Sequence, residues 1–120
     1  MGGPFQLGTG TTIAEFTDGL SNTLLVGEKQ VPVSFHGIGW LDCSTYNGDY
    51  HMCSTRAARE IPRPITTDPH SKEWKFGSRH PGVVLFCFGD GHVRSLPETI
   101  DPHTFFLLGK RNDGLLIPDY

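Results

Sequence analysis

The sequence lacks a long apolar run, an excess of basic residues and closely spaced cysteine pairs, and each absence argues against a class of function. No run of about eighteen apolar residues occurs, so the sequence predicts no membrane-spanning helix. Lys and Arg number 10 against 13 Asp and Glu, and this net charge of −3 argues against a nucleic-acid partner. No two of the three cysteines have the spacing of a zinc ligand pair, which disfavours a zinc site.

Charged and hydrophobic residues are scarce, whereas residues that interrupt regular structure are common. The chain is 19% charged and 37% hydrophobic, and it contains 15 Gly and 9 Pro. This composition predicts a loop-rich single domain with short strands and a modest core. Residues 1–10 lack the basic and apolar regions of a signal peptide, so we expect a flexible leader followed by one globular domain over 11–120.

Short apolar stretches predict a small antiparallel sheet. TLLVGE (23–28) has the composition of a short strand, and VSFHGIGWL (33–41) has its alternation. GVVLFCF (82–88) is rich in β-branched and aromatic residues, and a GDG turn joins it to the alternating HVRSL (92–96). These two stretches predict a β-hairpin. LLIP (115–118) could add an edge strand.

Two short helical segments complete the predicted fold. Thr11 or Thr12 could cap a turn in which Glu15 reaches back, as in a capping box. Asp101 could cap a second helix that ends at Gly109. The sequence therefore predicts an α+β fold with a small antiparallel β-sheet, a C-terminal hairpin, short helices and long loops.

A polar loop between two cysteines is the first candidate recognition surface. An oxidising compartment would allow Cys43 and Cys53 to form a disulfide, and a reducing one would leave two thiols. Tyr46 and Tyr50 lie in this loop, where exposed aromatic rings could bind a glycan or a protein. Cys87 lies within the apolar run, where we expect it to act as a small buried hydrophobe.

Four blocks in a fixed order carry a resemblance to a known family. In the central block, HPGVVLFCFGDG, nine residues separate His80 from Asp90 and Gly91. The other blocks are FTDGLSNTLLVGE (16–28), FGSRHPG (76–82) and ETIDPHTFFLLGKRNDG (98–114). Together they resemble the pilin-like family of planctomycete-type bacteria with the H-X9-DG motif (DUF1559), which is related to type IV pilins and pseudopilins. The chain departs from the family in having FGDG for Phe-Ala-Asp-Gly, and in lacking the paired glycines and Glu of the closing turn.

The resemblance implies a non-enzymatic globular head that needs no cofactor. Its partners would be other pilin-like or secretion-system subunits in the cell envelope, on the periplasmic or extracellular side. Full-length relatives begin with a processed leader and an apolar anchor helix. The sequence leaves open whether such a helix was removed here or is naturally absent.

We expect the motif residues to have structural roles. An extended strand would separate His80 from Asp90 by up to about 30 Å, so a catalytic pair is disfavoured. Asp90 would instead accept backbone N–H groups in the Gly-flanked turn. A second motif cluster could bind Ca²⁺ through Asp18 and Asn22, although an Asx-turn is the favoured interpretation. This cluster consists of Asp18, Gly19, Ser21 and Asn22.

Two other functions remain as alternatives. The first is an extracellular adhesion module that binds glycan or protein through Tyr46 and Tyr50. The second, less favoured, is a metal-dependent hydrolase built from His80, His92, Asp90 and Asp18, for which the sequence offers no supporting nucleophile.

Overall fold

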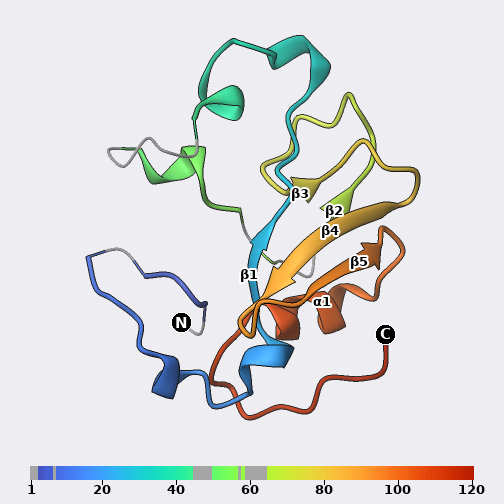
Figure 1. The fold of residues 1–120 in the computed structure, drawn as a ribbon. Coiled ribbons are helices and arrows are strands. Elements are labelled where there is room, and N and C mark those ends of the chain that lie inside the picture. Colours follow the sequence, from blue (N-terminus) through green and yellow to red (C-terminus); the bar gives the residue numbers. More distant parts are fainter. Residues whose placement is uncertain (1–2, 7, 45–49, 57, 59–64) are drawn as a thin grey trace.

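The computed structural model describes residues 3–6, 8–44, 50–56, 58 and 65–120, and the statements below concern these residues (Figure 1). The strands are β1 (Leu24–Gly27), β2 (Ile65–Thr66), β3 (Phe76–Gly77), β4 (Val83–Phe88) and β5 (Val93–Pro97), and the helix is α1 (Pro102–Leu108). Short 3-10 turns span Ile13–Glu15, Leu20–Asn22, Val33–Phe35, Trp40–Asp42 and His51–Cys53. The predicted α+β fold is confirmed.

The main sheet is antiparallel and has the strand order β1-β4-β5. β4 and β5 form the predicted hairpin, in which Leu85 lies opposite Ser95. β1 pairs with the other edge of β4, and a register shift separates its Leu24 and Val26 pairings. A second, two-stranded sheet consists of β2 and β3 in parallel, an arrangement that the sequence did not predict.

The core lies between one face of the main sheet and α1. Val84, Phe86 and Phe88 alternate along β4 and are fully or almost fully buried. They cluster with Phe105 and Leu108 of α1, which lies against this face (Figure 1). Burial of such side chains is the main source of stability in a domain this small.

The helical signals in the sequence lead to the predicted local structures. Asp101 caps α1, because its carboxylate accepts a hydrogen bond from the backbone N–H of Thr104 at 2.8 Å. Gly109 follows the last helical residue as the C-cap. In the first 3-10 turn, the backbone N–H of Thr12 donates to the Glu15 carboxylate at 2.7 Å. Both predicted caps are confirmed.

Two predicted strands are absent from the described structure. Residues 33–41 form turns, in which Gly37 and Gly39 have φ values of 70° and 72°. A strand cannot continue through such backbone conformations, so alternation in the sequence was misleading here. Residues 115–118 are also not a strand, because the tail packs Ile117 against the core instead of pairing along an edge.

The N-terminal residues contact the end of the domain. The Arg111 guanidinium, which is buried, donates a hydrogen bond to the carbonyl of Gly3 and lies 3.6 Å from the Glu15 carboxylate. The flexibility expected for residues 1–10 stays a prediction. No helix in the described part of the chain is long and apolar enough to cross a membrane.

β1 continues beyond Gly27 and joins the two sheets. Glu28 is still bound to β4, whereas Lys29 forms an antiparallel bridge with Phe76 of β3. Gly27 stands at the crossing, where Phe76 and Phe86 make an edge-to-face contact with centroids 5.2 Å apart. A Cβ atom at Gly27 would lie within 2.8 Å of both rings. The missing side chain therefore allows the backbone to pass over the aromatic cluster.

We predict that Gly27→Ala destabilises the fold by about 1–3 kcal/mol, because the added methyl overpacks the Phe76 and Phe86 rings. Gly10→Ala is the matched control, since a Cβ there has nothing within 4 Å. The free energy of unfolding from urea titrations measures both variants. Equal stability of the two would contradict the close approach seen at Gly27.

Candidate functional site

The motif blocks of the sequence meet where β1 changes its partner strand. The backbone N–H of Glu28 donates to the Leu85 carbonyl at 3.2 Å, as expected for a β1–β4 ladder. The Glu28 carbonyl, however, accepts from Gly77 of β3 at 2.9 Å. The N–H of Leu85 is bound instead by the Glu28 carboxylate, at 2.7 Å. The side chain thus replaces the acceptor that the backbone has given to the other sheet.

His80 lies beside this carboxylate. Its Nε2 is 3.2 Å from the second oxygen of Glu28, and both side chains are partly exposed. Ser78 positions the histidine, since its hydroxyl accepts from the His80 backbone N–H at 3.0 Å and donates to the Val83 carbonyl at 2.5 Å. The histidine of the H-X9-DG motif therefore pairs with Glu28 of the Gly-Glu block.

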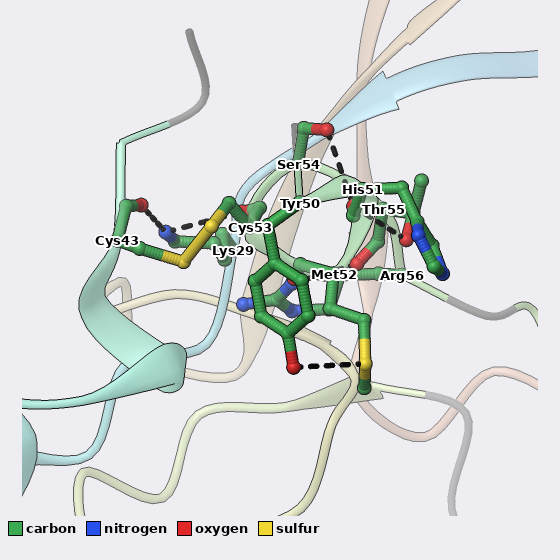
Figure 2. Close-up of a disulfide and its surroundings, with 9 residues drawn as sticks. All are labelled: Lys29, Cys43, Tyr50, His51, Met52, Cys53, Ser54, Thr55 and Arg56. Carbon is green, nitrogen blue, oxygen red and sulfur yellow. Dashed lines mark hydrogen bonds between the residues drawn. A yellow bond between two sulfur atoms is a disulfide. The ribbon is translucent and has the colours of Figure 1, made fainter. Parts of the chain in front are cut away.

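The two residues after Glu28 each bind a distant loop. The Lys29 ammonium donates to the carbonyls of Cys43 and Cys53, at 2.7 and 3.4 Å (Figure 2). The buried Gln30 amide donates to the carbonyls of Asp68 and Ser71, at 2.8 and 3.1 Å. We call residues 28–30 the hub, because three consecutive side chains hold a strand and two loops.

The hub also forms one side of an open pocket of about 340 Å³. Residues 77–79, from the block that precedes the motif histidine, also line it. The Arg79 guanidinium donates to the carbonyl of another lining residue, Val31, at 2.6 Å. The lining residues are Glu28, Lys29, Gln30, Val31, His36, Gly77, Ser78 and Arg79.

Asp90 lies at the other end of β4, in the hairpin turn. Its carboxylate accepts from the backbone N–H of His92 at 3.1 Å and lies 2.6 Å from Nδ1 of the same residue. These bonds, the backbone one foremost, lower the pKa of Asp90. The His92 ring stacks on Phe88 with centroids 4.3 Å apart, and Gly91 has a φ of 89° that suits the turn.

A departure from the family pattern at residue 89 has a steric cause in this chain. A Cβ atom at Gly89 would lie 2.8 Å from the Leu20 carbonyl oxygen and 3.0 Å from its side chain. The alanine usual in the family would therefore collide with the 3-10 turn Leu20–Asn22. Glycine lets this turn lie closer to the hairpin.

The Asp18 cluster binds the C-terminal segment. The Asp18 carboxylate accepts from the backbone N–H groups of Asp113 and Gly114, both at 2.8 Å. Gly19 has a φ of 95°, and the Asn22 amide donates to the Asp18 carbonyl at 3.0 Å. The Asp18 carboxylate thus binds backbone N–H groups of a turn that is distant in sequence, and not those of the turn that contains Asp18. Ser21 lies exposed in the adjacent 3-10 turn.

No group of three or more His, Cys, Asp or Glu side chains with the geometry of a metal site occurs among the described residues. The two Ca²⁺ candidates, Asp18 and Asn22, direct their side chains to backbone groups. Calcium binding at this cluster stays a prediction.

The disulfide loop contains the predicted aromatic candidates. The structure joins Cys43 to Cys53, with Cα atoms 5.2 Å apart. Tyr50 is 41% exposed, and its hydroxyl lies 3.3 Å from the Met52 sulfur (Figure 2). Tyr46 lies outside the described residues. Cys87 is partly exposed on the outer face of the sheet, so the expected complete burial is wrong for this residue.

Sequence reasoning missed the hub. Glu28 ended a block of the resemblance, but nothing local marked it as the partner of Leu85 and His80. The useful signal was an acidic residue directly after a strand, at the position where the family blocks place Gly-Glu. Nothing in the local sequence marked Lys29 or Gln30, because each side chain binds carbonyls that are far away in sequence.

The comparisons with known proteins give one match. The model of a family described as "Protein of unknown function (DUF1559)" matches residues 2–103. The match includes the blocks at 16–28, 76–82 and 80–91, and it ends within the closing block. No curated protein and no solved structure matches the chain.

We predict that Glu28→Ala lowers the free energy of unfolding by about 1–3 kcal/mol, because the N–H of Leu85 loses its acceptor. Glu28→Gln keeps an oxygen acceptor and changes only the partly exposed contact with His80, so it should cost about 1 kcal/mol or less. Hydrogen exchange at the Leu85 amide provides a direct measurement. Fast exchange is expected in the alanine variant alone, and equal protection in both variants would rule out this role of the carboxylate.

We also predict that stability falls in acid. Backbone N–H groups are the main cause of lowered pKa values at Asp90, Asp101 and Glu15. Their unfolded-state pKa values are about 3.9 for Asp and 4.3 for Glu. Because the folded-state pKa values are lower, these carboxylates stabilise the fold above the unfolded values. This stabilisation is lost as the pH falls through the folded ones.

Melting temperatures between pH 7 and pH 2 would measure this dependence. Asp101→Asn is the informative variant, because Asn still caps a helix but does not titrate. It should melt near the wild-type temperature at pH 7 and show a shallower decrease in acid. An unchanged acid slope in an Asp90→Asn, Asp101→Asn double variant would contradict the assignment.

Proposed function

Because the chain belongs to the DUF1559 family, we propose that it is the non-enzymatic globular head of a pseudopilin-like protein in a cell-envelope assembly. It would act through contacts with other pilin-like or secretion-system subunits. The hairpin at 82–96 would be the constant scaffold, and the loops within residues 42–70 would be the variable, partner-facing part of the surface.

The observation that carries this proposal is how the motif side chains are used. Glu28 and Asp18 bind backbone N–H groups of distant segments, and Asp90 binds within its own turn. A catalytic carboxylate would direct its oxygens to a substrate position, whereas each of these carboxylates uses at least one oxygen to bind the protein's own backbone. Residues used in this way support a structural family scaffold.

The disulfide supports the proposed compartment. Disulfides persist in oxidising environments such as the periplasm and the cell surface. Cys43 and Cys53 close a loop that Lys29 also binds to β1, so the loop has two anchors. An extracytoplasmic location on the periplasmic or extracellular side follows as part of the proposal.

One observation favours a second candidate, the glycan- or protein-binding adhesion module. Tyr50 exposes 41% of its surface at the edge of the disulfide loop, where an aromatic ring could stack on a sugar. The hydrolase alternative has no comparable observation. Its four residues are not together. His80 lies at one end of β4 and His92 with Asp90 at the other, and the Asp18 carboxylate binds the C-terminal segment.

Cross-linking in the native cell tests the proposal. The epitope-tagged full chain, expressed in its native host, should fractionate with the envelope. It should also cross-link to pilin-like subunits, which mass spectrometry would identify. Tyr50→Ala on the surface and Gly27→Ala in the scaffold separate contact loss from unfolding. Recovery only as a cytosolic monomer would overturn the proposal. Glycan-array binding lost in Tyr50→Ala would instead favour the adhesion module.

A further inference from the structure

Arg56 follows the 3-10 turn His51–Cys53 and uses only part of its hydrogen-bonding capacity. Its Nη1 donates to the carbonyls of Met52 and Thr55, at 3.0 and 2.6 Å. The guanidinium is partly buried and lies near Lys29 (Figure 2). Burial lowers the pKa of Arg56 to about 10, which leaves the group charged at neutral pH.

The described residues supply no partner for the other edge of this guanidinium. Nε and Nη2 of Arg56 are both buried and have no hydrogen-bond acceptor among those residues. These two nitrogens share one edge of the planar group, and their N–H bonds point in parallel. This fork matches the two oxygens of a carboxylate, which binds it through two parallel hydrogen bonds. Buried donors are rarely left unpaired in native proteins, so this edge requires an explanation.

A second cation, the Lys29 ammonium, lies near this edge. Desolvation lowers the pKa of the Lys29 ammonium, and the nearby positive charge of Arg56 lowers it further. Asp42 acts in the opposite direction, but its carboxylate accepts a hydrogen bond from the Gly37 backbone. Neither Lys29 nor Arg56 forms a salt bridge within the described residues. Two cations therefore lie close together without an acid bound between them.

Capping of the neighbouring turn explains only half of this arrangement. Lys29 and the Nη1 atom of Arg56 donate hydrogen bonds to the carbonyls of residues 43, 52, 53 and 55, which suits the end of a 3-10 turn. A lysine at residue 56 could serve the same purpose. The desolvated Nε–Nη2 edge is the feature that capping does not use.

We propose that the Nε–Nη2 edge of Arg56 is a binding site for a carboxylate group, with the Lys29 ammonium as the second positive charge. The inference goes beyond the proposed function, because these N–H donors could bind the carboxylate of any partner or free ligand. Because both nitrogens are covered, the carboxylate must displace the groups over them, and binding should therefore alter hydrogen exchange in residues 50–56. The acid would come from an Asp or Glu side chain of a second protein or from a free organic acid.

Thermal unfolding of the oxidised full chain tests the site. Sodium acetate is titrated against sodium chloride at constant ionic strength. The wild type should show a rise of about 6 °C at ten times the dissociation constant, and the rise should keep growing with the logarithm of the acetate concentration. Arg56→Lys keeps the charge but loses the fork, so the rise should disappear. Arg94→Lys, a change at an exposed arginine of β5 that does not line the pocket, is the matched control and should keep it.

Three further measurements complete the test. Acetyl-Gly-Glu-Gly-amide, compared with its Gln counterpart, distinguishes a side-chain carboxylate from a small free acid such as acetate. Acetate should also shift the ¹⁵N–¹H resonance of Arg56 Nε in the wild type, so the test does not depend on folding of the variant. Glu60→Gln tests whether Glu60, which is close to Arg56 in sequence, competes with acetate for the guanidinium. The proposal is overturned if the wild type shows no acetate-specific rise in melting temperature or no saturable resonance shift, if Arg56→Lys responds equally, or if acetate binds only to the Glu60→Gln variant.

Discussion

The change of partner strand at Glu28 is the constraint on which the rest of the structure depends. A strand that leaves one sheet for another abandons a backbone N–H, and a buried or half-buried donor is costly to leave unpaired. Here the same residue that gives its carbonyl to Gly77 supplies its carboxylate to Leu85. The chain can therefore connect a three-stranded sheet to a two-stranded one without losing a hydrogen bond at the junction.

The loops of the molecule depend on this junction as well. Once the chain has passed from β1 to its bridge with β3, the Lys29 side chain reaches the disulfide loop. The Gln30 side chain reaches residues 68–71. A small core of short strands stabilises such loops poorly by apolar burial alone. In this protein, the Lys29 and Gln30 side chains hold the loops by binding their backbone carbonyls, and the disulfide adds a covalent anchor.

The sequence predicted what depends on neighbours in the chain and failed where distant contacts decide. The hairpin 82–96 and the helix capped by Asp101 carry their turn, cap and apolar signals within a few residues. Residues 33–41 alternate as a strand does, but glycines with positive φ turn that segment, and β3 occupies the edge of the β1 continuation. The partner of His80 lies 52 positions earlier, and no local pattern could reveal that contact.

The spacing of the motif follows from the length of β4. His80 precedes the strand and Asp90 follows it, so the nine intervening residues are the Pro-Gly turn, the six residues of β4 and Gly89. Between these ends, Val84, Phe86 and Phe88 face the core in alternation. One residue more or fewer would either turn these side chains to the opposite face or separate an end from its partner. The fixed spacing can therefore arise from packing and pairing at the two ends of one strand, without any reaction that joins His80 to Asp90.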